Sequence, residues 1–472
     1  MKKFRAICLF LAMVLLLGTI STGVQAAPRD SSVTEGCYSV DAAVALGGSE
    51  KLLDTSKAVI LYELNSDTLV YAYNADKTIY PSSMVKIMTA LVALEKGELS
   101  SVATVTRTAL SHVAIGSVSA GLKVGEEIAL EDLLYCMMTA SANDASVVIA
   151  EHIAGTQAEF IQMMNEKAAE LGCTGTHYSN VHGLHDEQTY TTVRDICKIL
   201  EVALENETFR TMFEAKSHTV PATNMSEART VITTNYMMSR DYTPKYFDGR
   251  VTGGKTGSTD QAGRCLAATA DVNSMKLLAI VMGAKPTYEE EGISLKTFGS
   301  FEEMSALLDF AGENYEYQQI FYENQTVSQY PVSGGANHVT TTPDRVTSVV
   351  LPKGLAKEEL TWVYENGVPV ITAPVQKGQN ISFVQVWYGS ICVAQTNLIA
   401  MNSVDVWVEP TEPSGNIRQE EDDDGMTLAV ILIILLGIVL LGIAGFFVVN
   451  WIRWSAERAR RRRRRINRRR SR

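Results

Sequence analysis

A serine and a lysine three residues apart, Ser83 and Lys86, open the part of the sequence that could carry chemistry. On a helix, residue i+3 lies on the same face as residue i, so the lysine can approach the serine hydroxyl and take its proton. Lysine acts as a base only when burial or a second positive charge lowers its pKa, and Lys255 could provide that charge. The free backbone N–H groups at a helix start suit a developing oxyanion. The pair predicts an activated serine nucleophile with Lys86 as its general base.

Two further polar groups follow in the order that a complete acyl-transfer site needs. Ser141 offers a hydroxyl that could relay a proton to a leaving amine, and Asn143 offers an amide for a substrate peptide bond. Lys255 and Thr256 could bind a substrate carboxylate, and Gly257 would let the substrate backbone lie close to a strand. Each group alone is typical of an ordinary helix cap, turn or loop. Together, in this order, they predict attack on a carbonyl beside a free carboxylate.

Residues 1–26 are typical of a secretory signal peptide. A basic start precedes an apolar run at 6–20 and a small-residue site at 24–26. An uncleaved anchor is the alternative, but this apolar run is short for a membrane span, which needs about 20 residues. We therefore expect cleavage after Ala26.

The other end of the chain predicts a single membrane span. Residues 425–452 carry no charged side chain. This run is long enough for a helix that crosses the bilayer core, which needs about 20 residues. An acidic linker at 409–424 precedes this run, and twelve arginines follow it within 453–472. Because positive flanks stay in the cytoplasm, we expect a single-pass protein of the cell membrane with the tail inside and the body of the protein outside.

The charge distribution argues against a nucleic-acid partner. The chain has a net charge of −11, of which the tail carries +11 and the signal peptide +3, leaving −25 on the body. So acidic a body is not expected to bind nucleic acid. The arginine tail lies directly beside the predicted span, which favours contact with anionic lipid.

The cysteines leave disulfide pairing open. Six remain after the signal peptide: Cys37, Cys136, Cys173, Cys197, Cys265 and Cys392. They lack paired C-x-x-C spacing, which argues against a structural zinc site. Several lie in apolar runs, where buried free thiols are as reasonable as disulfides outside the cell. We expect no metal and no other cofactor.

The segment 51–314 predicts an α+β catalytic domain after a leader segment at 27–50 that has no sustained period. A strand hairpin and two later strands are expected at 58–63, 68–73, 264–270 and 276–282, with helices at 83–95, 130–138, 144–153, 158–171 and 193–204. Thr192 with Asp195 resembles a capping box for the last of these helices. The arrangement favours helices packed on an antiparallel sheet rather than βαβ repeats.

From residue 315 the sequence becomes rich in short strands. They are expected at 347–351, 360–364, 368–373 and 381–388, with turn signals between them. This pattern predicts a small all-β domain at 315–408.

In their sequence contexts the motifs resemble the low-molecular-mass penicillin-binding proteins of the serine D-alanyl-D-alanine carboxypeptidase family. The resemblance covers about 51–408 and rests on five segments: 80–90, 141–145, 180–184 with 192–195, 254–259, and 262–263. It implies an antiparallel sheet with helices on both sides, followed by a C-terminal β domain.

The resemblance also implies a reaction. The enzyme would remove the terminal D-Ala from peptidoglycan stem pentapeptides through an acyl-enzyme on Ser83, and β-lactam antibiotics would acylate the same serine. By family analogy the oxyanion hole would use the backbone N–H groups of Ser83 and Ser258.

The sequence departs from relatives in three respects. Ser258 stands where relatives often carry a bulkier residue, and no arginine lies between 284 and 312, where Lys296 is the nearest basic candidate. Relatives also often end in an amphipathic helix, whereas this chain has a predicted span. His182, in the intermediate segment, is interpreted as a packing or loop residue rather than a catalytic one.

Other functions stay open from the sequence alone. A β-lactamase would share the acylation groups, but no E-x-x-L-N-like segment is present to position a hydrolytic water. A non-catalytic wall-binding or signalling protein of the same fold is a further alternative, against which the intact Ser83, Lys86 and Lys255 argue. Transpeptidase or endopeptidase activity also stays open, because an amine can resolve the same acyl-enzyme.

Overall fold

The computed structural model describes residues 40–42, 44–241, 243–289, 295–364 and 371–409. The predicted signal peptide, membrane span and arginine tail lie outside these residues. Among the residues that are described, no helix is both long and apolar enough to cross a bilayer.

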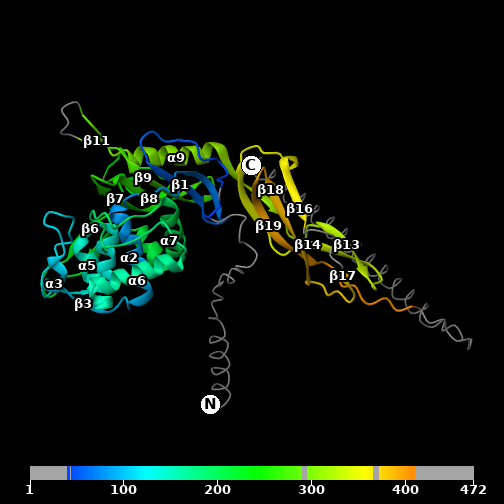
Figure 1. The fold of residues 1–472 in the computed structure, drawn as a ribbon, viewed down its shortest axis with the longest axis horizontal. Helices are drawn as coiled ribbons and strands as arrows, with labels where there is room; N and C mark the ends of the chain where they lie inside the picture. Colours follow the sequence, from blue (N-terminus) through cyan, green and yellow to red (C-terminus); the bar gives the residue numbers. More distant parts are fainter. Residues whose placement is uncertain (1–39, 43, 242, 290–294, 365–370, 410–472) are drawn as a thin grey trace, which may run out of the picture. The chain divides into compact units, whose positions relative to one another are not determined.

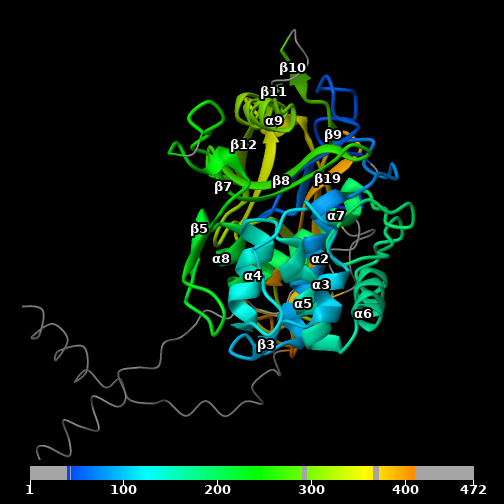
Figure 2. The same cartoon turned by 90° about the vertical axis from the view of Figure 1, so that its left-hand side faces the viewer.

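A five-stranded antiparallel sheet forms the centre of the catalytic domain (Figures 1 and 2). Its order is β2-β1-β9-β8-β7, with β1 at Ala58–Glu63, β2 at Thr68–Tyr73, β7 at Val251–Thr259, β8 at Gly263–Val272 and β9 at Met275–Ala284. Strand β1 is buried at all six positions, so both of its faces are covered. Ile60 and Tyr62 pack into one apolar core, whereas Val59 and Leu61 pack into the other. The alternation of side chains along one strand therefore builds two cores.

Helices cover both faces of this sheet, as expected. On one side lie α2 (Val85–Lys96), α4 (Leu130–Thr139), α5 (Asn143–Ala154), α6 (Gln157–Glu170), α7 (Val193–Glu205) and α8 (Glu207–Phe213), and on the other α9 (Ser300–Asn314) (Figure 1). Shorter elements connect them: η1 (Ser82–Met84), β3 (Val102–Thr104), α3 (Arg107–Ser111), β4 (Glu127–Ala129), β5 (Ser217–Val220), β6 (Arg229–Ile232), η2 (Tyr236–Met238), β10 (Thr287–Tyr288) and β11 (Leu295–Thr297).

The predicted helices and strands of this domain agree with the structure to within a few residues, with one correction. The helix expected at 83–95 begins as the 3-10 turn η1, and its α-helical part starts at Val85. Thr192 caps α7 by accepting a hydrogen bond from Asp195 N (3.0 Å). The Asp195 carboxylate instead accepts from Gly175 N (2.8 Å) and Thr176 Oγ1 (2.7 Å), so it ties α7 to the preceding loop.

A second part, from residue 315, is built from strands. Its six-stranded sheet has the order β16-β18-β19-β14-β13-β17, and β12 pairs with β15. The bounds are β12 Tyr315–Phe321, β13 Ser328–Ser333, β14 His338–Pro343, β15 Thr347–Pro352, η3 Lys357–Glu359, β16 Leu360–Tyr364, β17 Ile371–Thr372, β18 Asn380–Tyr388 and β19 Ile391–Ala400. The predicted fold class is thus confirmed for the catalytic and β domains.

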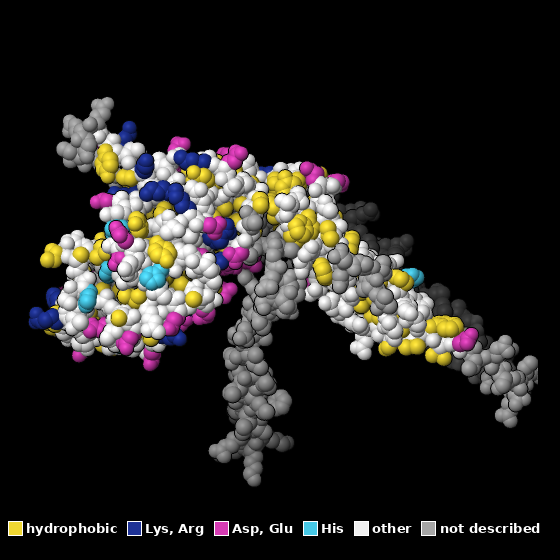
Figure 3. All heavy atoms as spheres, in the orientation of Figure 1, with side chains coloured by type: hydrophobic (Ala, Val, Ile, Leu, Met, Phe, Trp, Pro, Cys, Tyr) yellow, Lys and Arg dark blue, Asp and Glu magenta, His cyan; other side chains and the backbone are white. Residues whose placement is uncertain are grey.

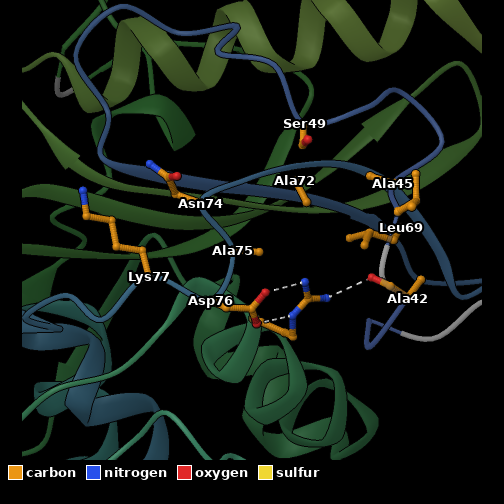
Figure 4. A pocket seen from close by; sticks show the side chains of 11 residues that line it. Ala42, Ala45, Ser49, Leu69, Ala72, Asn74, Ala75, Asp76 and Lys77 are labelled. Atoms are coloured by element: carbon orange, nitrogen blue, oxygen red, sulfur yellow. Dashed lines mark hydrogen bonds and ion pairs between the residues drawn. The ribbon is translucent and has the colours of Figure 1, made fainter.

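Part of the predicted leader segment packs against the catalytic domain. Leu46 N and Gly47 N donate to the carbonyls of Leu69 (2.9 Å) and Val70 (2.6 Å) on β2, the edge strand of the sheet. Arg194 at the start of α7 pairs with Asp76 and donates to the carbonyl of Ala42 beside a cavity of about 340 Å³ (Figure 4). The sequence did not predict this contact, because the segment has no period.

The described cysteines are of two kinds. Cys136, Cys173, Cys197 and Cys265 are buried free thiols, whereas Cys392 is disulfide-bonded. Burial raises the pKa of Cys136 to about 12, so this thiol is inert at neutral pH. Cys37 lies outside the described residues.

Candidate active site

Ser83 lies in the turn η1, directly before α2. The preceding residue, Ser82, has a φ of 50°, a left-handed conformation that costs on the order of 1–3 kcal/mol for a residue with a side chain. Two glycines make room for this turn. A Cβ on Gly183 would lie 1.9 Å from Ser82 O, and one on Gly257 of β7 would lie 3.2 Å from Ser83 N. The loop around Gly183 and the strand β7 therefore fix the serine from two sides.

Lys86 is fully buried one turn later, and its ammonium nitrogen faces Ser83. Lys86 Nζ lies 3.2 Å from Ser83 Oγ and 2.7 Å from Asn143 Oδ1, and it also donates to the carbonyl of His182. Burial holds the pKa of Lys86 well below its ordinary value, and the charge of Lys255 lowers it further, while Asp144 acts in the opposite direction. A lysine that loses its proton this readily can act as a base at neutral pH.

Ser141 and Lys255 form the second half of the cleft. Ser141 stands between α4 and α5 with a φ of 64°, and Lys255 Nζ donates to its Oγ (2.8 Å). Lys255 is 1% exposed, and burial lowers its pKa to about 7. The structure therefore brings the two predicted lysines and two predicted serines together, and the Asn143 side chain joins them through Lys86.

The other predicted residues lie along β7, an edge strand of the sheet. Lys255 and Gly257 face the buried side, and the hydroxyl of Thr256 lies 2.5 Å from that of Thr234. Ser258 is exposed and pairs with Arg264 in the β7–β8 register. Thr234 was not among the predicted site residues, because nothing in its local sequence marks it.

Asp144 is a second residue that the sequence reasoning missed. Its buried carboxylate accepts hydrogen bonds from Ser119 Oγ (2.5 Å), Ala120 N (2.8 Å), Leu122 N (3.1 Å) and Ala145 N (3.0 Å). It thereby holds the loop at 117–122, from which the carbonyl of Val118 accepts from Asn143 N (2.8 Å). An acid in an apolar helix, directly after a motif residue, is the signal that could have found it.

His182 acts through its main chain. Its carbonyl accepts from Lys86, and its Nδ1 accepts from Leu184 N (3.1 Å), which leaves the proton on Nε2. Burial, with Lys86 and His112, lowers the pKa of His182 to about 4, so the ring is neutral at physiological pH. These contacts agree with its interpretation as a packing residue.

Among the described residues, no group of three or more His, Cys, Asp or Glu side chains is placed to hold a metal ion. The arrangement instead supports nucleophilic catalysis by serine. A buried lysine lies beside the Ser83 hydroxyl, and a second buried lysine donates to the Ser141 hydroxyl.

Comparison with known proteins connects this geometry to a family. Residues 49–286 match the family described as D-alanyl-D-alanine carboxypeptidase (Peptidase S11), and residues 315–406 match the C-terminal domain of penicillin-binding protein 5. D-alanyl-D-alanine carboxypeptidase DacF of Bacillus subtilis is 31% identical over 341 residues, which cover 71% of this chain and 82% of DacF. DacA of Haemophilus influenzae is 28% identical over 363 residues, covering 74% and 85%.

The solved structure of penicillin-binding protein 5 from Haemophilus influenzae is similar over 76% of this chain and all of its own, with a TM-score of 0.61 and 28% identity. The likeness thus includes both the catalytic and the β domain. The family predicted from the motifs is confirmed, and this chain belongs to the D-alanyl-D-alanine carboxypeptidases of the penicillin-binding protein type, which are serine-type hydrolases.

Proposed function

We propose that this protein is a membrane-anchored D,D-carboxypeptidase that removes the terminal D-Ala from peptidoglycan stem pentapeptides through an acyl-enzyme on Ser83. The observation that carries the proposal is the fully buried Lys86, with its Nζ 3.2 Å from Ser83 Oγ and its pKa well below the ordinary value. A serine hydroxyl needs such a base within hydrogen-bond reach.

Acylation follows from the positions of these groups. Neutral Lys86 takes the proton of Ser83 as Oγ attacks the carbonyl between the last two D-Ala residues. Backbone N–H groups of Ser83 and Ser258 would stabilise the oxyanion. Ser141, which accepts from Lys255 at 2.8 Å, would relay the proton taken by Lys86 to the departing amine of D-Ala, which leaves Lys86 neutral again. The C–N bond breaks and an ester on Ser83 remains.

Specificity for a chain end comes from the second lysine. Lys255, together with the hydroxyl of Thr256, would bind the carboxylate of the terminal D-Ala. A water molecule would then hydrolyse the ester, with Lys86 again as the base. A β-lactam would acylate Ser83 by the same attack, because its carboxylate and strained amide present the same groups.

Membrane attachment is proposed from the sequence alone. The uncharged run at 425–452 and the arginines that follow it support a single span with the catalytic domain on the wall side. The tail would contact anionic lipid of the cytoplasmic leaflet.

The test measures D-Ala release from a peptide that ends in D-Ala-D-Ala, using the full-length protein in detergent. We expect release by the wild type and a loss of at least about 1,000-fold in Ser83→Ala. Equal release by the two proteins would refute the mechanism. Rapid multiple turnover of a chromogenic cephalosporin would instead support the β-lactamase alternative.

A further inference from the structure

The antiparallel register gathers basic side chains at one end of the catalytic sheet. Lys57 directly precedes β1, Lys285 directly follows β9, and Arg264 is the second residue of β8. Arg264 pairs with Ala284, the residue before Lys285. Lys57 N donates to the carbonyl of Met282 on the same strand (2.9 Å). The three cations therefore come from neighbouring strands that end at one edge.

Two further lysines join this group through an aromatic cluster. The Arg264 guanidinium lies 5.3 Å from the ring centre of Phe298, whose ring is 5.3 Å from that of Tyr246. Lys245 Nζ lies 4.9 Å from the Tyr246 ring centre and donates to the carbonyl of Lys296. We call the five residues Lys57, Lys245, Arg264, Lys285 and Lys296 the basic edge. Figure 3 shows Lys and Arg side chains gathered on this part of the surface.

The basic edge gathers five cations that have no acidic partner in an ion pair among the described residues. Four of its members are exposed and Arg264 is half-buried. Other cations, such as Arg194 and Arg250, pair with carboxylates. Within the described residues, no ion pair joins any member of the basic edge to an acid, although Asp260 and Glu289 are exposed in the same region. Unpaired cations in a body with a net charge of −25 favour an anionic ligand at this place.

The proposed binding mode directs the stem peptide from the active site toward this edge. If Lys255 holds the terminal carboxylate and Ser83 receives the scissile carbonyl, the rest of the stem peptide runs antiparallel to β7 and past Thr259. An extended chain advances about 3.3 Å per residue. The two stem residues that precede D-Ala-D-Ala therefore reach about 7 Å beyond the scissile end of the peptide. That distance leads to the β7–β8 turn, where Lys57 Nζ approaches Gln261 O at 3.5 Å. Arg264 pairs across from Ser258 beside this turn.

We propose that the basic edge binds free carboxylates of the stem peptide that lie on the N-terminal side of its D-Ala-D-Ala end. The inference rests on the proposed carboxypeptidase function and adds a selection rule to it. Stems with a free side carboxylate bind well, and stems in which that carboxylate is amidated bind less well. The discrimination lies outside the catalytic groups, so it affects KM more than kcat.

The experiment uses full-length protein and two synthetic stem pentapeptides that differ only in the carboxylate of their second residue, which is free or amidated. We expect Lys285→Gln/Lys296→Gln to lower kcat/KM for the free-acid peptide about fivefold to tenfold, as two exposed charge contacts allow. The amidated peptide should be unaffected. The matched control Arg345→Gln/Lys377→Gln removes two exposed charges in the β domain and should change neither value.

Other results would overturn the inference. An equal loss of kcat/KM for both peptides would indicate a structural effect. An unchanged kcat/KM for both peptides would show that these cations do not bind the stem carboxylate. A loss seen only with intact cell walls would assign the edge to a different wall polymer. Failure of the proposed function is distinguishable, because the wild type would then release no D-Ala from the amidated peptide.

Discussion

Replacement of Gly183 by alanine should disable Ser83 as a nucleophile, although Ser83 itself is unchanged. Gly183 has a φ of 83°, and a Cβ at this position would lie 1.9 Å from Ser82 O and 2.9 Å from Ser83 N. Ordinary contact begins near 3.4 Å, so the turn that carries Ser83 would have to move by about 1.5 Å. Misplacement of reacting groups by about 1 Å costs on the order of 100-fold in rate. We therefore expect a loss of at least about 100-fold in acylation of Ser83 by a fluorescent penicillin.

The control for this variant is Gly378→Ala in the β domain. Gly378 has a similar φ of 87°, but nothing lies within 4 Å of its virtual Cβ. Both variants bear the cost of a left-handed alanine, about 1–2 kcal/mol of stability, so both should melt at lower temperature. Only Gly183→Ala should lose acylation. An acylation rate within threefold of the wild type for Gly183→Ala would show that the turn is not held in the way described.

Three other variants test separate parts of the site and fold. Burial lowers the pKa of Lys255 to about 7, so its positive charge is lost as pH rises above that value. We therefore expect kcat/KM for a D-Ala-D-Ala peptide to fall on the alkaline side of the pH profile. Lys255→Arg should move this alkaline limb to higher pH. Asp144→Asn should lower stability by about 2–3 kcal/mol in urea unfolding, since an amide cannot accept all four hydrogen bonds. It should also move the acid limb of penicillin acylation to lower pH, because Asp144 raises the pKa of Lys86; an unchanged limb would contradict that coupling. Thr156→Ala removes the side chain that caps α6 through Glu159 N (3.2 Å) and should cost about 1 kcal/mol of stability with unchanged D-Ala release.

Periodic and chemical signals account for what the sequence predicted. The hairpin of β1 and β2 and the helices from α4 to α7 have apolar patterns long enough to identify their type and approximate ends. The site motifs were recognisable because Ser83, Lys86 and Lys255 are chemically unusual in combination, even though they are far apart in the chain. Their convergence depends on tertiary contacts, and it is the β7–β8 register and the burial of α2 that bring it about.

The features that the sequence did not predict lack such local signals. Their contact partners lie far away in the chain, in segments without a periodic pattern. Asp144 bonds to a loop 22–25 residues earlier, and Thr234 meets Thr256 from a segment without periodicity. The left-handed turn at Ser82 packs against Gly183, about one hundred residues later, where a side chain would leave no room for it. Residues 46 and 47 join the sheet through main-chain bonds, which any side chain can make. No local pattern in the sequence encodes such contacts.

The two buried lysines can perform different tasks because their surroundings lower their pKa values by different routes. Lys255 is affected by burial alone, which leaves its pKa at about 7 and a part of its population charged at neutral pH. Lys86 is affected by burial and by the charge of Lys255, so it loses its proton first. A substrate carboxylate bound at Lys255 would stabilise the ammonium form there. It would offset part of that ammonium's effect on Lys86, and the burial of Lys86 would then keep the base neutral. The site is therefore best poised near neutral pH, where one lysine still binds an anion while the other can accept the proton of Ser83.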